Sequence, residues 1–167
     1  MKAMVASACL LSALAGTATA QEMAKANFID MAGQQSGTAT LTQSPKGVLM
    51  QIEVTGLPAG EWVAFHVHEN GTCDHATNHD SAGGHFNPGN AEHGFLTANG
   101  PHAGDMPNQQ VGADGSLRAQ VFNTMVALDG GANAIRGRSL MIHGGKDDYK
   151  SQPSGDAGKR QACAVIE

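Results

Sequence analysis

The segment 69–107 is the feature of the sequence that most constrains the fold, because its nearly forty residues carry no apolar periodicity. Gly, Asn, Asp, His and Pro dominate it. A loop of this length inside a compact domain is uncommon unless it is functional or something ties it down. A second irregular segment, 144–158, follows later. The fold must therefore hold two long loops against a scaffold.

Short segments of alternating apolar and polar residues surround these loops and predict strands. They cover 25–31, 38–42, 48–54, 61–68, 109–113, 116–123, 138–143 and 161–166. Turn residues at 44–47 and at Asp114-Gly115 separate neighbouring strands. We find no convincing helix, repeat or internal linker. The pattern predicts seven or eight strands in an antiparallel sandwich or barrel.

Composition agrees with a single loop-rich β domain, since the 167 residues include 22 Gly and only 4% aromatic residues. The 10 Lys and Arg residues against 15 Asp and Glu leave a net charge of -5. No basic field is available to hold a phosphate backbone, so we expect no nucleic-acid partner.

The first twenty residues have the pattern of a cleaved secretory signal peptide. Lys2 precedes an apolar run to about Ala15, and Ala18-Thr19-Ala20 forms a small-x-small cleavage site before Gln21. The run is too short to span a bilayer, and Cys9 lies too early to be a lipidated first residue. We therefore expect a domain at 21–167, without a membrane span, in the periplasm or outside the cell.

Export leaves two cysteines, Cys73 and Cys163. In an oxidising compartment a disulfide between them is the default state, and two free thiols are the alternative.

Six histidines and one aspartate are spaced as metal ligands. His66 and His68 alternate on one predicted strand and share a face with Trp62 and Ala64. The first long loop adds three imidazoles and a carboxylate, which suit tetrahedral zinc, whereas imidazoles from strands or strand ends suit copper with an open position. The loop residues are His85, His93, His102 and Asp105, and the strand residues are His66, His68 and His143.

Each of these histidines alone would more often be a surface or polar loop residue. Their joint placement beside an otherwise unexplained loop indicates metal binding. His75 and His79 fit neither set, and we interpret them as solvated loop residues.

Ordered motifs along the chain resemble those of the copper/zinc superoxide dismutases of the exported bacterial type. They are Phe65-His66-Val67-His68-Glu69, Gly83-Gly84-His85-Phe86-Asn87-Pro88, His93-Gly94, Gly100-Pro101-His102-Ala103-Gly104-Asp105, Ile142-His143-Gly144-Gly145-Lys146-Asp147-Asp148 and Gly158-Lys159-Arg160-Gln161-Ala162-Cys163. The resemblance implies an all-β fold, namely an eight-stranded antiparallel Greek-key β-barrel or flattened sandwich with two long functional loops. It also implies dismutation of superoxide to O2 and H2O2 by copper cycling between Cu(II) and Cu(I).

The resemblance implies one copper and one zinc per subunit. Copper would be held by His66, His68, His85 and His143, and zinc by His85, His93, His102 and Asp105. His85 would bridge the two metals and carry a proton in catalysis. Asp147 would orient one histidine of each metal, and Cys73 and Cys163 would form the disulfide within the subunit.

An anionic substrate needs a positive local field on this acidic protein. Arg160 matches the family arginine that orients superoxide, and three lysines of the same region are candidates to assist it, namely Lys146, Lys150 and Lys159. A solvated charge cluster, partly cancelled by neighbouring aspartates, is the alternative for the lysines.

The sequence departs from the family where Val63-Ala64 replace His-Gly before the first copper histidine, and in the centre of the 144–158 loop. A noncatalytic copper- or zinc-binding or copper-buffering module on the same fold is the competing function. It predicts an incomplete ligand set or a missing arginine. The sequence leaves open whether the protein forms a homodimer.

Overall fold

The computed structural model describes residues 21–167. The first three strands of this part form an antiparallel meander. The predicted signal peptide lies outside the described residues. The meander contains β1 (Met23–Asp30), β2 (Gln35–Ser44) and β3 (Gly47–Val54), paired in order. Alternate residues of β1 are buried, because successive side chains of a strand point to opposite faces.

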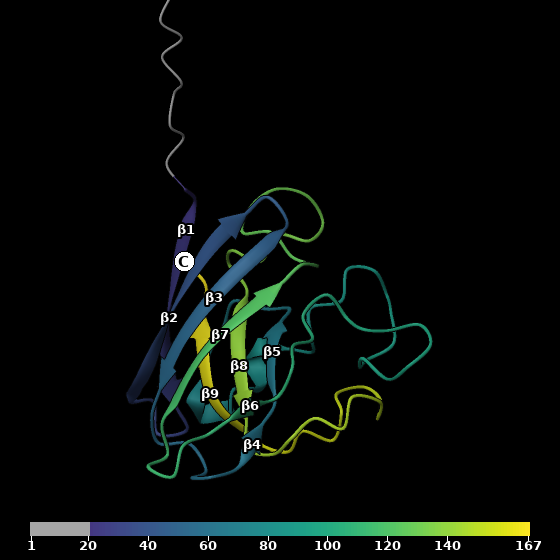
Figure 1. Ribbon diagram of the computed structural model, residues 1–167. Coiled ribbons are helices and arrows are strands. Elements are labelled where there is room, and N and C mark those ends of the chain that lie inside the picture. Colours follow the sequence, from purple (N-terminus) through teal and green to yellow (C-terminus); the bar gives the residue numbers. More distant parts are fainter. Residues whose placement is uncertain (1–20) are drawn as a thin grey trace, which may run out of the picture.

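The remaining strands complete one curled sheet and one small ribbon (Figure 1). They are β4 (Trp62–Val63), β5 (Phe65–His68), β6 (Gln109–Gln110), β7 (Leu117–Asn123), β8 (Ser139–His143) and β9 (Arg160–Val165). The seven-stranded sheet has the order β5-β8-β9-β1-β2-β3-β7, and β4 pairs with β6. The predicted all-β antiparallel architecture is confirmed.

The apolar core lies inside the curl of the sheet. Its large, fully buried side chains include Phe28, Leu41, Ile52, Phe65 and Leu140, which come from five strands. Burial of this kind contributes about 1.5–3 kcal/mol per large side chain. The core therefore anchors β5 and β8, the two strands that carry histidines of the site.

The predicted strand at 61–68 is in fact two strands, which makes nine rather than eight in the described part of the chain. The break is at Ala64, whose N–H donates to the carbonyl of Gly145 and whose carbonyl accepts from the N–H of His143. Trp62 lies in the other sheet and is 51% exposed, so it does not share a face with the histidines. The departure from the family sequence at Val63-Ala64 is fully buried.

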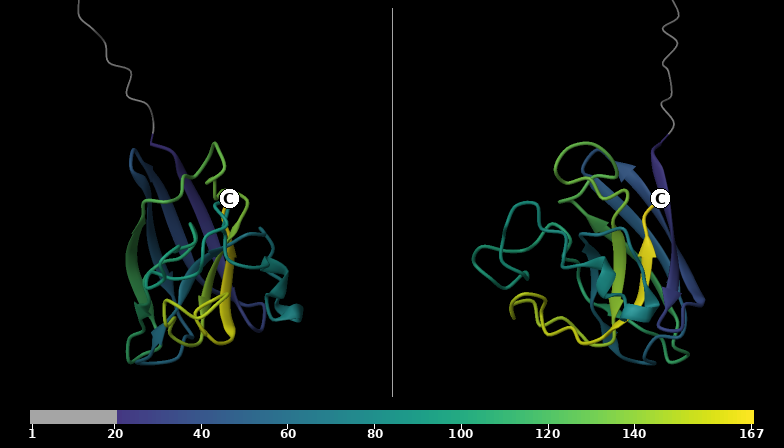
Figure 2. Two further views of the ribbon diagram at one scale, coloured as in Figure 1. Left: turned by 90° about the vertical axis from the view of Figure 1, so that its right-hand side faces the viewer. Right: turned by 180° about the vertical axis from the view of Figure 1, so that it is seen from behind.

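The two long loops project from the same side of the sheet and lie beside each other (Figure 2). The N–H of Leu96 donates to the carbonyl of Tyr149 across them. Gly94 has φ +99°, and a Cβ there would overlap the Tyr149 carbonyl, so this approach requires glycine. Two short 3-10 helices occur within the first loop, at His75–Thr77 and Asp80–Ala82. The loops are thus tied to each other as well as to the sheet.

Candidate metal centre

Four imidazoles form the first donor cluster, and three of them come from strands. His66 and His68 lie two residues apart on β5 and point to the same side, as the alternation predicts. His143 ends the neighbouring strand β8. The loop residue His85 reaches the cluster through an isolated antiparallel β-bridge, a main-chain pairing with His68. One ring nitrogen from each histidine lies within 4.8 Å of the others, and all four residues are buried.

The hydrogen bonds of these rings leave one nitrogen of each ring with a lone pair that no donor group faces. The Nδ1–H of His68 donates to the carbonyl of Gly83 at 2.9 Å, and Nδ1 of His143 lies 3.3 Å from the carbonyl of Gly158. Their Nε2 atoms then face each other at 3.4 Å with lone pairs on both. His66 Nδ1 and His85 Nε2 are buried without any hydrogen-bond partner. These four imidazole nitrogens fit a copper ion.

The second cluster gathers around one carboxylate oxygen. Oδ1 of Asp105 lies 2.9, 3.1 and 3.5 Å from the Nδ1 atoms of His85, His93 and His102. The Nδ1 atom of His102 is buried without a hydrogen-bond partner. Oδ2 accepts from the N–H groups of Gly94 and His102, which fixes the carboxylate. Three nitrogens and one oxygen are the donors of a closed tetrahedral zinc site.

The surroundings of Asp105 keep it ionised. Burial alone would raise its pKa, but hydrogen bonds from the surrounding imidazoles and from the Gly94 N–H hold the pKa well below its usual range. An ionised carboxylate is the form that binds a metal ion.

His85 belongs to both clusters. Its Nδ1 faces Asp105, and its Nε2 is the unpartnered atom of the first cluster. Burial lowers the pKa of His85 to about 4, although its hydrogen bond to Asp105 opposes this effect. The ring is therefore neutral at physiological pH, and loss of its one remaining N–H proton would leave a lone pair on each nitrogen, one for each cluster.

Asp147 connects one histidine of each cluster. Its Oδ2 lies 2.9 Å from His66 Nε2, and its Oδ1 lies 3.0 Å from His93 Nε2. Burial lowers the pKa of His93, but its hydrogen bonds to Asp105 and Asp147 outweigh this effect and raise the pKa to about 9. A carboxylate in this position orients both rings and selects which nitrogen remains for a metal.

Two amide side chains that the sequence analysis missed support these ligands. Asn108 accepts from the N–H of Asp147 and donates to its carbonyl, at 2.8 and 2.9 Å. Gln152 makes the same paired contact with the main chain of His93, at 2.9 Å in both directions. Neither residue belongs to a ligand motif, so residue type and spacing carried no signal for them.

Arg160 is held beside the first cluster by two carbonyl groups. Its Nη1 and Nη2 donate to the carbonyls of His79 and Gly83, at 2.6 and 2.7 Å. Burial lowers the pKa of Arg160, and the charge of Asp80 opposes this effect. The guanidinium retains its charge, because an arginine pKa starts far above neutrality.

The predicted disulfide between Cys73 and Cys163 is confirmed, with an S–S distance of 1.99 Å. Because it joins the first long loop to β9, it ties the segment that supplies the His79 and Gly83 carbonyls to the strand that begins at Arg160.

The remaining charged candidates differ in position. Lys159 lines a hollow with Arg160, whereas Lys146 and Lys150 are exposed and outside it. His75 is exposed, as predicted. The interpretation of His79 as a solvated residue is wrong, since this side chain is fully buried. Its carbonyl accepts from Arg160, and its N–H donates to the carbonyl of Asp74.

The fold and site together define a protein with adjoining copper and zinc sites on a curled antiparallel sheet, linked by a shared histidine. Residues 35–166 match the family described as copper/zinc superoxide dismutase. The chain belongs to the copper/zinc superoxide dismutase family.

Individual relatives agree over most of their length. Superoxide dismutase [Cu-Zn] 1 of Aquifex aeolicus is 45% identical, covering 95% of this chain and 96% of its own. Superoxide dismutase [Cu-Zn] of Caulobacter vibrioides is 39% identical, with 81% and 80% covered. The Cu/Zn superoxide dismutase structure from Brucella abortus has a TM-score of 0.72 at 31% identity, covering 87% of this chain and all of that one.

A structure of a SOD-like protein from Bacillus subtilis is also similar, with a TM-score of 0.81 at 33% identity, covering 86% of this chain and 97% of that one. Within residues 21–167, no helix is long and apolar enough to cross a membrane.

Proposed function

We propose that this protein is a superoxide dismutase that converts two superoxide ions and two protons to O2 and H2O2. The observation that carries this function is the position of His85, with one ring nitrogen in each donor cluster. The noncatalytic alternative predicts an incomplete ligand set or a lost arginine. Both clusters are complete, and Arg160 is in place, so a binding or buffering module is not favoured.

In this proposal His66, His68, His85 and His143 hold copper, and His85, His93, His102 and Asp105 hold zinc. Copper supplies the one-electron redox chemistry and zinc a fixed charge that orients the shared ligand. Asp147 keeps the rings of His66 and His93 in orientation. His85 Nε2 is placed to hold a proton when it is not a ligand and to deliver it to the reduced product.

Arg160 binds and orients the anion. Its side chain is 20% exposed and lines a hollow at the surface. Planar N–H donors and a permanent charge suit a small diatomic anion. Lys159 adds positive charge to the same hollow.

We also propose that residues 1–20 are a signal peptide cleaved near Ala20, and that the domain at 21–167 acts in the periplasm or outside the cell. The disulfide supports an oxidising location. Mass spectrometry of protein from the periplasmic fraction should give a chain that begins at Gln21. An uncleaved chain recovered from the cytoplasm would contradict this location.

Pulse radiolysis tests the catalytic function. The protein loaded with copper and zinc should accelerate superoxide decay at a rate near the diffusion limit, and the metal-free protein should not. Slow decay with both sites fully occupied would favour the binding module.

A further inference from the structure

Three of the five N–H groups of the Arg160 guanidinium are left over after its two loop contacts, and one of them is on Nε. Nη1 and Nη2 donate to the carbonyls of His79 and Gly83, and the structure gives Nε no hydrogen bond to any described residue. An anion that approaches Arg160 can therefore use the Nε–H and the outer N–H groups.

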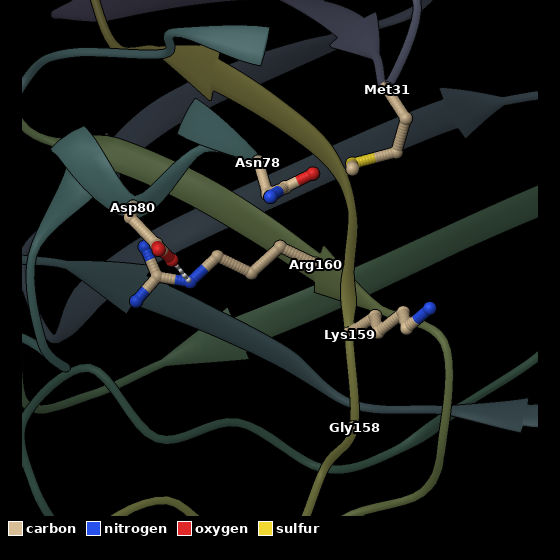
Figure 3. Close-up of a pocket in the computed structure, with 6 residues that line it drawn as sticks. All are labelled: Met31, Asn78, Asp80, Gly158, Lys159 and Arg160. Carbon is tan, nitrogen blue, oxygen red and sulfur yellow. Dashed lines mark ion pairs between the residues drawn. The ribbon is translucent and has the colours of Figure 1, made fainter. Parts of the chain in front are cut away.

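The carboxylate of Asp80 already faces this side of the guanidinium. Its Oδ1 lies 3.8 Å from Nε, which is an ion pair but too long for a hydrogen bond. Figure 3 shows the Arg160 side chain extending toward Asp80, with Asn78 nearby and Lys159 pointing away from the pair. These residues line one hollow of about 310 Å³.

The backbone keeps Asp80 at this distance. Asp80 begins the 3-10 helix Asp80–Ala82, and the carbonyls that accept from Arg160 belong to the residues on either side of this helix. The Asp80 side chain is 76% exposed, whereas that of Arg160 is 20% exposed. The carboxylate therefore lies largely in solvent, while the main chain on both sides of its helix is bound to the guanidinium.

We propose that Asp80 weakens the attraction of Arg160 for small anions, superoxide included. This inference rests on the proposed role of Arg160 in binding superoxide. A negative charge beside the guanidinium reduces the local positive field and competes with an incoming anion for the Nε–H.

If Asp80 only held the guanidinium in place, its removal would weaken anion binding, whereas the proposal expects binding to become tighter. Two short hydrogen bonds to carbonyl groups already hold the guanidinium, and the Asp80 side chain has no hydrogen bond within the described residues that Asn would break. The substitution Asp80→Asn therefore removes the charge and preserves the shape.

The test uses azide as the probe anion and the protein loaded with copper and zinc. Azide titration followed by visible absorption should give a dissociation constant two- to fivefold lower for Asp80→Asn than for the wild type, as expected for loss of an exposed charge pair. Superoxide decay at low ionic strength should be faster by a similar factor, and added salt should slow it more steeply. Metal analysis should show equal occupancy.

Two controls isolate the effect. Glu53→Gln makes the same change in net charge at an exposed position on β3, separated from β9 by β1 and β2 in the sheet, and should leave azide affinity unchanged. In an Arg160→Gln background, Asp80→Asn should have no effect. Unchanged or weaker azide binding in Asp80→Asn, or equal tightening in Glu53→Gln, would overturn the inference.

The two proposals fail differently. Tighter azide binding in Asp80→Asn, found in a protein that does not accelerate superoxide decay, would retain the inference for anions and reject the dismutase function. Rapid wild-type decay with identical azide affinity in both proteins would retain the function and reject the role of Asp80.

Discussion

Arg160 and His68 donate hydrogen bonds to the same acceptor, the carbonyl oxygen of Gly83, at 2.7 and 2.9 Å. The residue that would bind the substrate and a residue that would bind copper are thus positioned by one peptide group. Gly83 lies between Cys73, which forms the disulfide, and His85, which both clusters share. The loop therefore fixes the anion site relative to the metal sites.

Replacement of Arg160 by alanine should lower superoxide turnover at least several-fold without removing copper, because no copper donor is altered. Pulse radiolysis measures the rate, and metal analysis with electron paramagnetic resonance verifies the copper site. Full turnover at full copper occupancy would exclude Arg160 from anion binding.

The substitution His93→Ala should abolish tight zinc binding and loosen the 69–107 loop, since one of four donors is lost and the link to Asp147 disappears. Hydrogen exchange should increase in this loop and remain unchanged in β1–β3. Exposed His75 provides the matched control, and His75→Ala should retain zinc. Undiminished zinc in His93→Ala would refute the ligand assignment.

Asp147→Asn should reduce zinc affinity by about 10- to 100-fold, the usual effect of removing a group that orients a ligand. The amide keeps the size of the side chain but cannot accept from both His66 and His93. Competition with a coloured chelator measures the affinity. Asp156→Asn, an exposed change in the same loop, should have little effect, and equal affinities in the two variants would argue against the role of Asp147.

Gln152→Glu should accelerate zinc release several-fold. The carboxylate can still accept from the His93 N–H but cannot donate to the His93 carbonyl, so one of two bonds to this ligand is lost. Stopped-flow transfer of zinc to a chelator gives the rate. Gln51→Glu on the exposed face of β3 makes the same chemical change away from the site. The same release rate in both variants would show that the paired contact is unimportant.

The metal-free protein should lose stability as pH falls from 6.5 toward 4. Burial lowers the pKa of His85 to about 4 and of His143 to about 3, and it also lowers the pKa of His66 and His68. These groups bind protons in the unfolded chain before they do so in the folded one, so acid favours unfolding. His93 has a raised pKa, and its contribution is already complete below 6.5.

Urea denaturation of the metal-free protein should show the free energy of unfolding falling by about 1 kcal/mol per pH unit or more in this range. His143→Gln should make the dependence shallower. A stability that is constant between pH 6.5 and 4 would contradict the burial of neutral imidazoles.

The loop donors and the strand histidines could be predicted because each is a residue of the required type and because strand alternation places His66 and His68 on one side. The place of His85 in both clusters was implied only by the resemblance to the family. The eight strand segments were likewise visible as local alternation. The break at Ala64 was not, because it depends on hydrogen bonds to Gly145 and His143 that replace the expected pairing. The buried side chain of His79 also has no local signature.

The sequence by itself determined the all-β class, the loops that required tethering and the residue types able to bind copper and zinc. Tertiary structure alone decided which ring nitrogen faces which cluster, and which groups hold Arg160, His93 and Asp147 in place. These latter contacts involve backbone carbonyls or amides about 40 to 80 residues apart in sequence. Such partners are available throughout any chain, so only folding selects among them.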